Sequence, residues 1–164
     1  MAIMRFKALE EYELRLSKLS TNTKRIAGKA IYVGAGIIAD AIRKNIEAIP
    51  SQDDKAGLIA YSKKTTAPFT DTAKKGLLDG LGITPLEEDD GIYNVKIGFD
   101  GYNDLKTKKY PKGQPNAMIA RSLESGSSIA EKRPFVRPAI NKSRKRAEQA
   151  MADIIDRETK KIID

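Results

Sequence analysis

The sequence predicts an α+β fold, in which a small antiparallel sheet packs against a long helix in the N-terminal half and a further helix lies at the C-terminus. Apolar residues recur with helical spacing over residues 22–49 and again after Pro138, whereas residues 92–99 alternate as a strand does. With 164 residues and no linker-like or repeated segment, the chain is expected to form a single domain over residues 1–164.

The N-terminal part of the chain is predicted to form two consecutive helices. Residues 20–23, Ser-Thr-Asn-Thr, offer side-chain oxygens that can cap the start of the second helix. We expect this second helix to run from about 22 to 49, to end at Pro50 and to be the central element of the core. The apolar face of the first helix consists of Phe6, Leu9, Tyr12, Leu16 and Leu19.

Two segments after the long helix carry weaker signals. Residues 50–70 are polar and are predicted to be a mobile loop, in which only residues 58–61 resemble a short strand. Thr70 or Asp71 is a suitable cap for a short helix that follows. The acidic run at 87–91 is expected to be an exposed turn.

Residues 92–99 are the clearest strand signal, and a single strand leaves its backbone groups unpaired. At least two other segments must therefore pair with it. The candidates are residues 58–62, part of 117–124, or a strand from a neighbouring subunit. Residues 117–124 themselves fit either a helix or a strand, although Pro115 before them and Gly126 after them favour a helix.

The chain contains no histidine, no cysteine and no tryptophan. These absences exclude imidazole or thiolate catalysis, cysteine-based metal sites and disulfides. We therefore expect a protein that is not an enzyme and that uses no cofactor or metal. No apolar run reaches the roughly 20 residues of a membrane span, and the N-terminus does not resemble a signal peptide. We expect no membrane contact and synthesis in the cytoplasm.

The positive charge is concentrated in one part of the chain. The formal net charge is +8, and residues 104–146 hold twelve basic and only three acidic residues. Such a field favours an anionic partner, either nucleic acid or an acidic protein surface, although a solvated basic surface is the alternative. Residues 104–115 are predicted to be a mobile loop within this region. The candidate basic contact surface consists of Lys106, Lys108, Lys109, Lys112, Lys142, Arg144, Lys145 and Arg146.

Gly34 and Gly36 form a G-x-G-x-x-A pattern, with acidic residues Asp53 and Asp54 further along the chain. This pattern is similar to a dinucleotide-binding fingerprint, which requires a strand before the glycines and a helix after them. Here the helical periodicity begins well before Gly34 and continues past it. The glycines are therefore interpreted as a small-residue patch against which another element packs.

Several short motifs occur in a distinctive order. They are the Val95–Phe99 strand, the Glu124-x-Gly126-Ser127 step and the Pro134-Phe135-x-Arg137-Pro138-Ala139 run. In this order the chain resembles the HK97 gp10-like family of tailed-phage head–tail joining and tail-completion proteins, over about residues 71–155. Many members carry an Asp-Thr-Gly-x-Leu step after the long helix, whereas this chain has Asp-Asp-Lys-Ala-Gly-Leu at residues 53–58.

The resemblance implies a structural virion protein without an active site. It implies a homo-oligomer, typically a hexameric ring, at the end of the tail that faces the head, in contact with the tail-tube protein and a head-completion or connector protein. It would be located in the virion, and in the host cytoplasm during assembly. A small basic protein that binds nucleic acid non-specifically is the alternative function.

The motif region supplies the candidate assembly interface. Gly126 tolerates a positive φ, and the two prolines stiffen the turn that follows. Phe135 is expected to be an apolar anchor, buried either in its own core or against a neighbouring subunit. The three arginines are candidates for pairing with acidic residues of an adjacent subunit or of the tail tube. The full set is Arg121, Glu124, Gly126, Arg133, Pro134, Phe135, Arg137 and Pro138.

Overall fold

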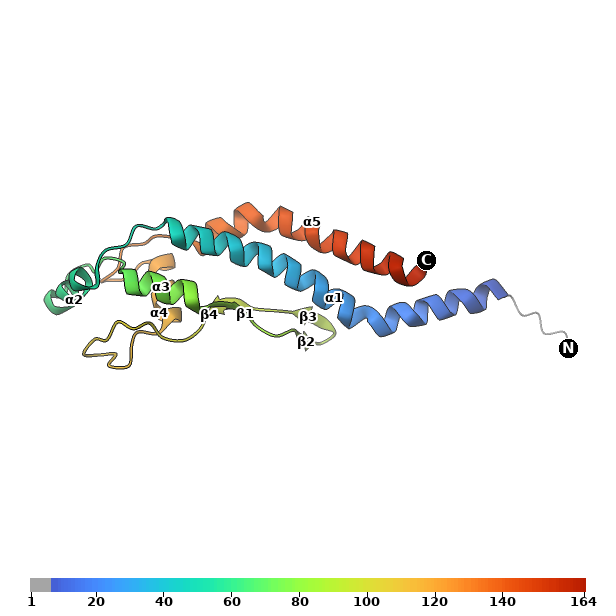
Figure 1. Ribbon diagram of the computed structural model, residues 1–164, viewed down its shortest axis with the longest axis horizontal. Coiled ribbons are helices and arrows are strands. Elements are labelled where there is room, and N and C mark those ends of the chain that lie inside the picture. The colour runs from blue at the N-terminus through green and yellow to red at the C-terminus, as the bar shows by residue number, and fades with distance from the viewer. Residues whose placement is uncertain (1–6) are drawn as a thin grey trace.

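The computed structural model describes residues 7–164, in which five helices and four short strands form the predicted α+β fold. The two long helices, α1 and α5, lie side by side along the long axis, and the shorter elements lie on the other side of α1 (Figure 1). In chain order the elements are α1 (Lys7–Ala48), α2 (Asp54–Lys63), α3 (Asp71–Gly80), β1 (Leu81–Ile83), β2 (Glu87–Asp89), β3 (Ile92–Asn94), β4 (Ile97–Phe99), α4 (Asn116–Ser125) and α5 (Val136–Ile163).

The predicted break at residues 20–23 is wrong, because α1 is one helix of 42 residues. Thr21 Oγ1 and Asn22 Nδ2 donate back to the Lys18 carbonyl, at 3.0 and 2.8 Å, instead of capping a new helix. Back-bonding of this kind bends helices, and α1 changes direction within its blue segment (Figure 1). The end of α1 at Ala48 agrees with the prediction. Part of the predicted first apolar face lies outside the described residues, namely Phe6 and the side chains of Leu9 and Tyr12.

The prediction that residues 50–70 form a loop with a short strand is wrong for residues 54–63, which form α2. Asp53 caps this helix, because its side chain accepts a hydrogen bond from Ala56 N at 3.0 Å. Lys64 ends the helix in the left-handed conformation, with φ at 53°. α2 was not recognised from the sequence because its apolar residues show no single helical face.

The strand predicted at 92–99 is divided into β3 and β4, and its predicted partners, 58–62 and 117–124, are wrong. β3 pairs with β2 and β4 pairs with β1, both antiparallel. Thr84 links the two small sheets, since its backbone N–H donates to Lys96 O at 2.9 Å and its Oγ1 accepts from Lys96 N at 2.8 Å. The partners therefore come from the residues immediately before the strand.

The acidic run is only partly the exposed turn that the sequence predicts. Glu87–Asp89 form β2, and all three residues are exposed. The turn itself consists of Asp90 and Gly91, with φ at 48° and 78°. A turn with two positive φ angles matches the twist of the strands that it joins, so this segment is a tight hairpin.

The short helices α3 and α4 follow their local signals. Thr70 caps α3 as predicted, because its Oγ1 accepts a hydrogen bond from Ala73 N at 3.2 Å. Residues 117–124, which fitted either a helix or a strand, belong to α4 between Pro115 and Gly126. Residues at the ends of both helices therefore mark where these helices begin or end.

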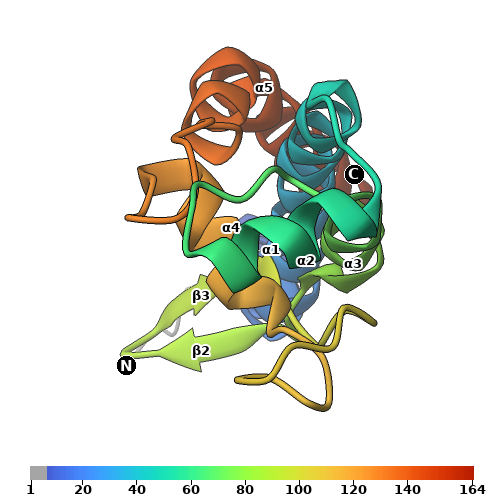
Figure 2. The same ribbon diagram turned by 90° about the vertical axis from the view of Figure 1, so that its left-hand side faces the viewer.

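The core lies between the C-terminal half of α1, α3, α4 and the start of α5, which surround it in the view along the long axis (Figure 2). Ile46 and Leu77 are fully buried, and Phe135 is 1% exposed. Phe135 contacts Phe99 of β4 edge to face, with ring centroids 5.8 Å apart. The long helix contributes Ile42 and Ile46 to this core.

Gly34 lies inside α1, at the contact with α5, which agrees with the packing interpretation of the two glycines. A Cβ atom at Gly34 would lie 2.5 Å from Met151 Sδ. Gly36 has nothing within 4 Å of the equivalent position, so only one of the two glycines is required by close packing.

Candidate functional site

The motif region forms a junction between α4 and α5 that is held by one carboxylate. Glu124 accepts hydrogen bonds from the backbone N–H groups of Phe135, Val136 and Arg137, at 2.8, 2.9 and 3.0 Å. These groups belong to the N-terminus of α5, where no residue of the helix's own provides a side-chain cap. Glu124 therefore caps α5 from a different helix, where its negative charge also complements the helix dipole.

The environment of Glu124 favours the charged carboxylate. Burial alone would raise its pKa, but the three backbone hydrogen bonds and the nearby Arg137 guanidinium together lower the pKa of Glu124 below its usual value. The group is thus ionised at neutral pH and fully occupied by backbone donors. This arrangement is a structural clamp and leaves no proton for general acid catalysis.

The loop between the two helices is short and tightly closed. Gly126 ends α4 with φ at 78°, a positive value that glycine tolerates, and a Cβ there would approach Lys132 Cβ to 3.1 Å. Arg133 N donates to Leu123 O at 2.7 Å. This hydrogen bond holds the end of the loop against α4, just before α5 begins. The Glu-x-Gly-Ser and Pro-Phe-x-Arg-Pro-Ala motifs are therefore two sides of one junction.

The residues of the predicted assembly interface divide into internal and exposed groups. Phe135 is buried in the core of its own chain, and Glu124 and Gly126 build the junction. Arg133 is half-buried and pairs with Glu131 at 3.1 Å. The exposed members are Arg121, Pro134, Arg137 and Pro138.

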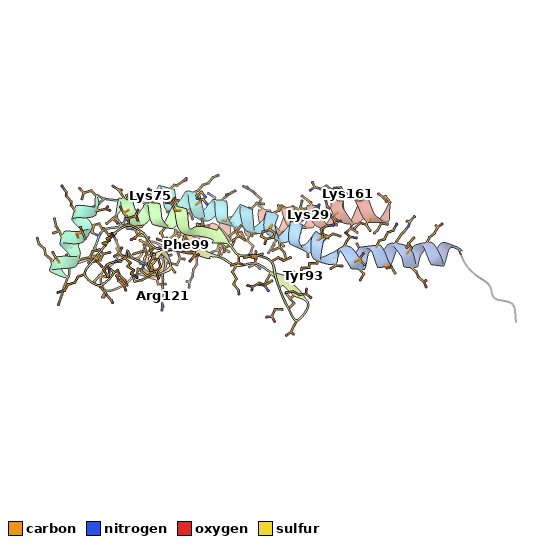
Figure 3. All side chains as sticks on the ribbon, turned by 60° about the horizontal axis from the view of Figure 1, so that its bottom comes forward. Lys29, Lys75, Tyr93, Phe99, Arg121 and Lys161 are labelled. Atoms are coloured by element: carbon orange, nitrogen blue, oxygen red, sulfur yellow. The ribbon has the colours of Figure 1, made fainter. Side chains whose placement is uncertain are left out.

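The exposed members do not all lie on one surface. Pro134 and Pro138 line a hollow of about 510 Å³ between the end of α1 and the start of α5. Arg121 extends from α4 on the side of the molecule that faces away from α1 (Figure 3). A partner that contacts both places must therefore reach around α4.

The structure also separates the eight residues of the candidate basic contact surface. Lys106, Lys108, Lys109 and Lys112 lie in the loop below α4, which contains no helix or strand, and Lys142, Arg144, Lys145 and Arg146 lie on α5. The loop and α5 are on opposite sides of the molecule in both ribbon views (Figures 1 and 2). The charge that is continuous in the sequence thus forms two distinct basic regions.

A groove of about 1150 Å³ opens beside the basic loop and was not predicted from the sequence. It lies between α2, α4 and residues 104–115, and its apolar lining includes Phe69, Ile119 and Leu123. The exposed side chains of Leu58 and Ile129 also line it. The groove could not be expected from the sequence, because residues 54–63 carried no helical signal.

A second carboxylate, Glu158, joins the other end of α5 to α1. Its side chain is 4% exposed and pairs with Arg25 at 3.0 Å, Lys29 at 2.8 Å and Lys161 at 2.9 Å. Hydrogen bonds from Lys29, Lys161 and Arg25 lower the pKa of Glu158 to about 2. Figure 3 shows Lys29 and Lys161 approaching each other where the two helices meet. The sequence did hold a signal, because Glu158 falls on the apolar side of the helix.

Within residues 7–164, no group of three or more acidic side chains is arranged to hold a metal ion. None of the helices in that range combines the length and apolarity needed to cross a membrane. No family model, curated protein or solved structure matches this chain.

Proposed function

We propose that this chain is a structural component of a tailed-phage virion, which acts in tail completion or head–tail joining. The observation that carries the proposal is the junction at Glu124. Its two motifs are those of the resemblance to HK97 gp10-like proteins, and they contact each other directly through three hydrogen bonds. The motif residues thus share one physical task, which is to fix α5 on α4 within an α+β fold.

Two of the described carboxylates, Glu124 and Glu158, have clearly lowered pKa values, and their surroundings support a structural role rather than a catalytic one. Glu124 is occupied by three backbone donors, and Glu158 by three cationic side chains. Perturbed carboxylates at an active site are usually poised to exchange a proton. Here the partners hold both groups in the charged form.

The proposed assembly is a hexameric ring at the head-proximal end of the tail. Its partners are further copies of this chain, the tail-tube protein and the head-completion or connector protein. The exposed guanidinium of Arg121, which forms no ion pair with any described residue, is a candidate contact with an acidic partner surface. The protein would be in the host cytoplasm before assembly and in the virion after it.

The test is deletion of the gene from the phage or prophage that carries it. We expect electron micrographs of lysates to show filled heads and separate tails, and the wild-type gene supplied in trans to restore joined particles. Arg121→Glu is expected to restore fewer particles than Lys160→Glu, a matched charge reversal at an exposed site near the end of α5. Normal infectious particles from the deletion strain would contradict the proposal.

Non-specific binding of nucleic acid remains a second candidate because of one feature of α5. Arg144 pairs with Glu148 at 2.8 Å, but Lys142, Lys145 and Arg146 form no ion pair within the described residues. Such free cations suit phosphate contacts, whose affinity falls steeply as salt rises. A gel-shift titration of duplex DNA at two salt concentrations tests this function, with the triple glutamine variant of those residues as control.

A further inference from the structure

The N-terminal part of α1 extends beyond the end of α5, and none of the other described elements lies beside it (Figure 1). We call residues 11–18 the arm. Every described side chain of the arm is exposed, including Leu14 at 56% and Leu16 at 48%. A helical segment that packs against no other described element gains no stability from tertiary contacts, so its exposed side chains are available to a partner.

The groove described above has the properties of a receiving site for such a segment. We call it the basic groove. Its floor is apolar, and five basic side chains line it against one acid, Glu131, which is already paired with Arg133. The basic side chains are Lys64, Lys106, Lys108, Lys109 and Arg133. Its occupant should therefore be amphipathic and acidic.

One face of the arm matches this requirement. The arm as a whole carries no net charge, because Glu11 and Glu13 are balanced by Arg15 and Lys18. Glu13 and Leu16 are three residues apart, so a carboxylate and an apolar side chain share one face of the helix, whereas Arg15 and Lys18 lie on the opposite side. Two turns of a helix about 10 Å wide fill roughly 850 Å³. This volume is close to that of the groove, about 1150 Å³.

The arm of a chain cannot reach the basic groove of the same chain. The arm lies at one end of the long axis, and α2 and the basic loop lie at the other (Figure 1). α1 connects the two ends as a continuous helix of 42 residues, roughly 63 Å long. Only a second molecule can bring an arm to a groove.

We infer that the arm of one copy docks in the basic groove of the next copy, with Glu13 facing the lysines of the basic loop and Leu16 on the apolar floor. Because the arm and the basic groove are different surfaces, two copies joined by one contact still have one free arm and one free groove. Repetition of such a contact closes a ring when the rotation between copies allows it. The inference rests on the proposed function in so far as it supplies the interface of the proposed ring.

Disulfide cross-linking tests this contact directly, because the natural chain has no cysteine. We expect a mixture of Leu16→Cys and Leu58→Cys to give linked dimers severalfold more readily than a mixture of Leu14→Cys and Leu58→Cys. Leu14 is the matched control, since it is exposed on the same arm but two residues away, and thus on a different face. The pairs are tested with purified full-length protein and with particles from the complemented deletion strain.

Charge reversal gives a second measurement on the same contact. Glu13→Lys and Lys108→Glu should each raise the apparent dissociation constant for self-association about tenfold, and the double variant should recover it. Glu11→Lys changes the same charge on another face of the arm and should have little effect.

Equal linking of the Leu16 and Leu14 variants, or no linking in protein and particles, overturns the inference. Linking of the arm to a different virion protein instead of a second copy also overturns it. Joined particles from the deletion strain would refute the proposed function alone, whatever the cross-linking result. Separate heads and tails without any arm–groove link would refute this inference alone.

Discussion

At the scale of single residues, Glu124 determines how α5 leaves α4. The sequence that enters α5 is Pro-Phe-Val-Arg-Pro, which has no serine, threonine, aspartate or asparagine to accept the first N–H groups. Glu124 supplies that acceptor from eleven to thirteen positions earlier in the chain. The helix is thus capped by a residue that lies too far away in the sequence to be recognised as a cap from the sequence alone.

Replacement of Glu124 by glutamine should destabilise the fold. Glutamine keeps an oxygen acceptor but loses the charge that the three N–H groups and the helix dipole favour. Since Glu124 is only half-buried, we expect a loss of about 1–2 kcal/mol in the free energy of unfolding, measured by urea denaturation. Glu131→Gln, at an exposed ion pair, should change it by less than about 0.5 kcal/mol. Equal effects of the two variants would show that Glu124 is not the clamp.

Glu158 predicts a pH dependence with a definite sign. Its pKa is about 2 in the folded chain and near 4.5 when unperturbed, so the folded state holds the charged form more strongly. The stabilisation is fully present above about pH 4.5 and is lost as the pH falls from 4.5 towards 2. Glu158→Gln should therefore be less stable than the wild type at pH 6, with the difference shrinking towards pH 2.5. A constant difference across thermal melts in this range would contradict the assignment.

At the scale of elements, the sequence predicts those helix ends that are determined by neighbouring residues. Thr70 caps α3 and Pro115 precedes α4 because the deciding residues stand beside the helices they limit. Residues 20–23 mislead because the same hydroxyl and amide groups that cap a helix can also bond back into it.

The formation of strands β1 and β2 depends on the strands that they pair with more than on their own sequences. β2 is Glu-Glu-Asp and β1 is Leu-Gly-Ile, and neither composition is typical of a strand. They become strands because β3 and β4 lie opposite them. The candidate site has the same division: the junction motifs are visible in the sequence, whereas the basic groove exists only once α2, α4 and the basic loop are assembled.

The α1–α5 contact makes a matched pair of glycine substitutions informative. Both substitutions gain about 0.5–1 kcal/mol in helix propensity, because both glycines lie inside α1. Gly34→Ala would also place a Cβ 2.5 Å from Met151 Sδ, so Met151 must move, at a cost of about 1–3 kcal/mol, whereas Gly36→Ala meets nothing within 4 Å. Thermal melts should therefore show Gly36→Ala to be more stable than Gly34→Ala. Equal melting temperatures of the two variants would mean that the two helices do not pack as closely as described.

At the scale of the whole molecule, the chain is elongated because one helix spans it (Figure 1). A compact chain of 164 residues has a radius of gyration of about 15 Å. A rod as long as α1 alone has one of about 18 Å. Small-angle scattering of the monomer should give a value clearly above 15 Å, and a value at or below it would exclude the extended arm.

The arm is the part of the molecule whose removal should separate folding from assembly. Every described side chain from residue 11 to residue 18 is exposed, so a chain that begins at residue 19 loses no buried side chain among those that the structure describes. We expect its midpoint of urea denaturation to match that of the full chain, because exposed residues contribute little to the free energy of unfolding. The same truncation should abolish self-association in sedimentation experiments and fail to restore joined particles in the deletion strain. Lower stability of the truncated chain would show that the arm belongs to the fold of the monomer. Full assembly of the truncated chain would contradict the docking of the arm on a second copy.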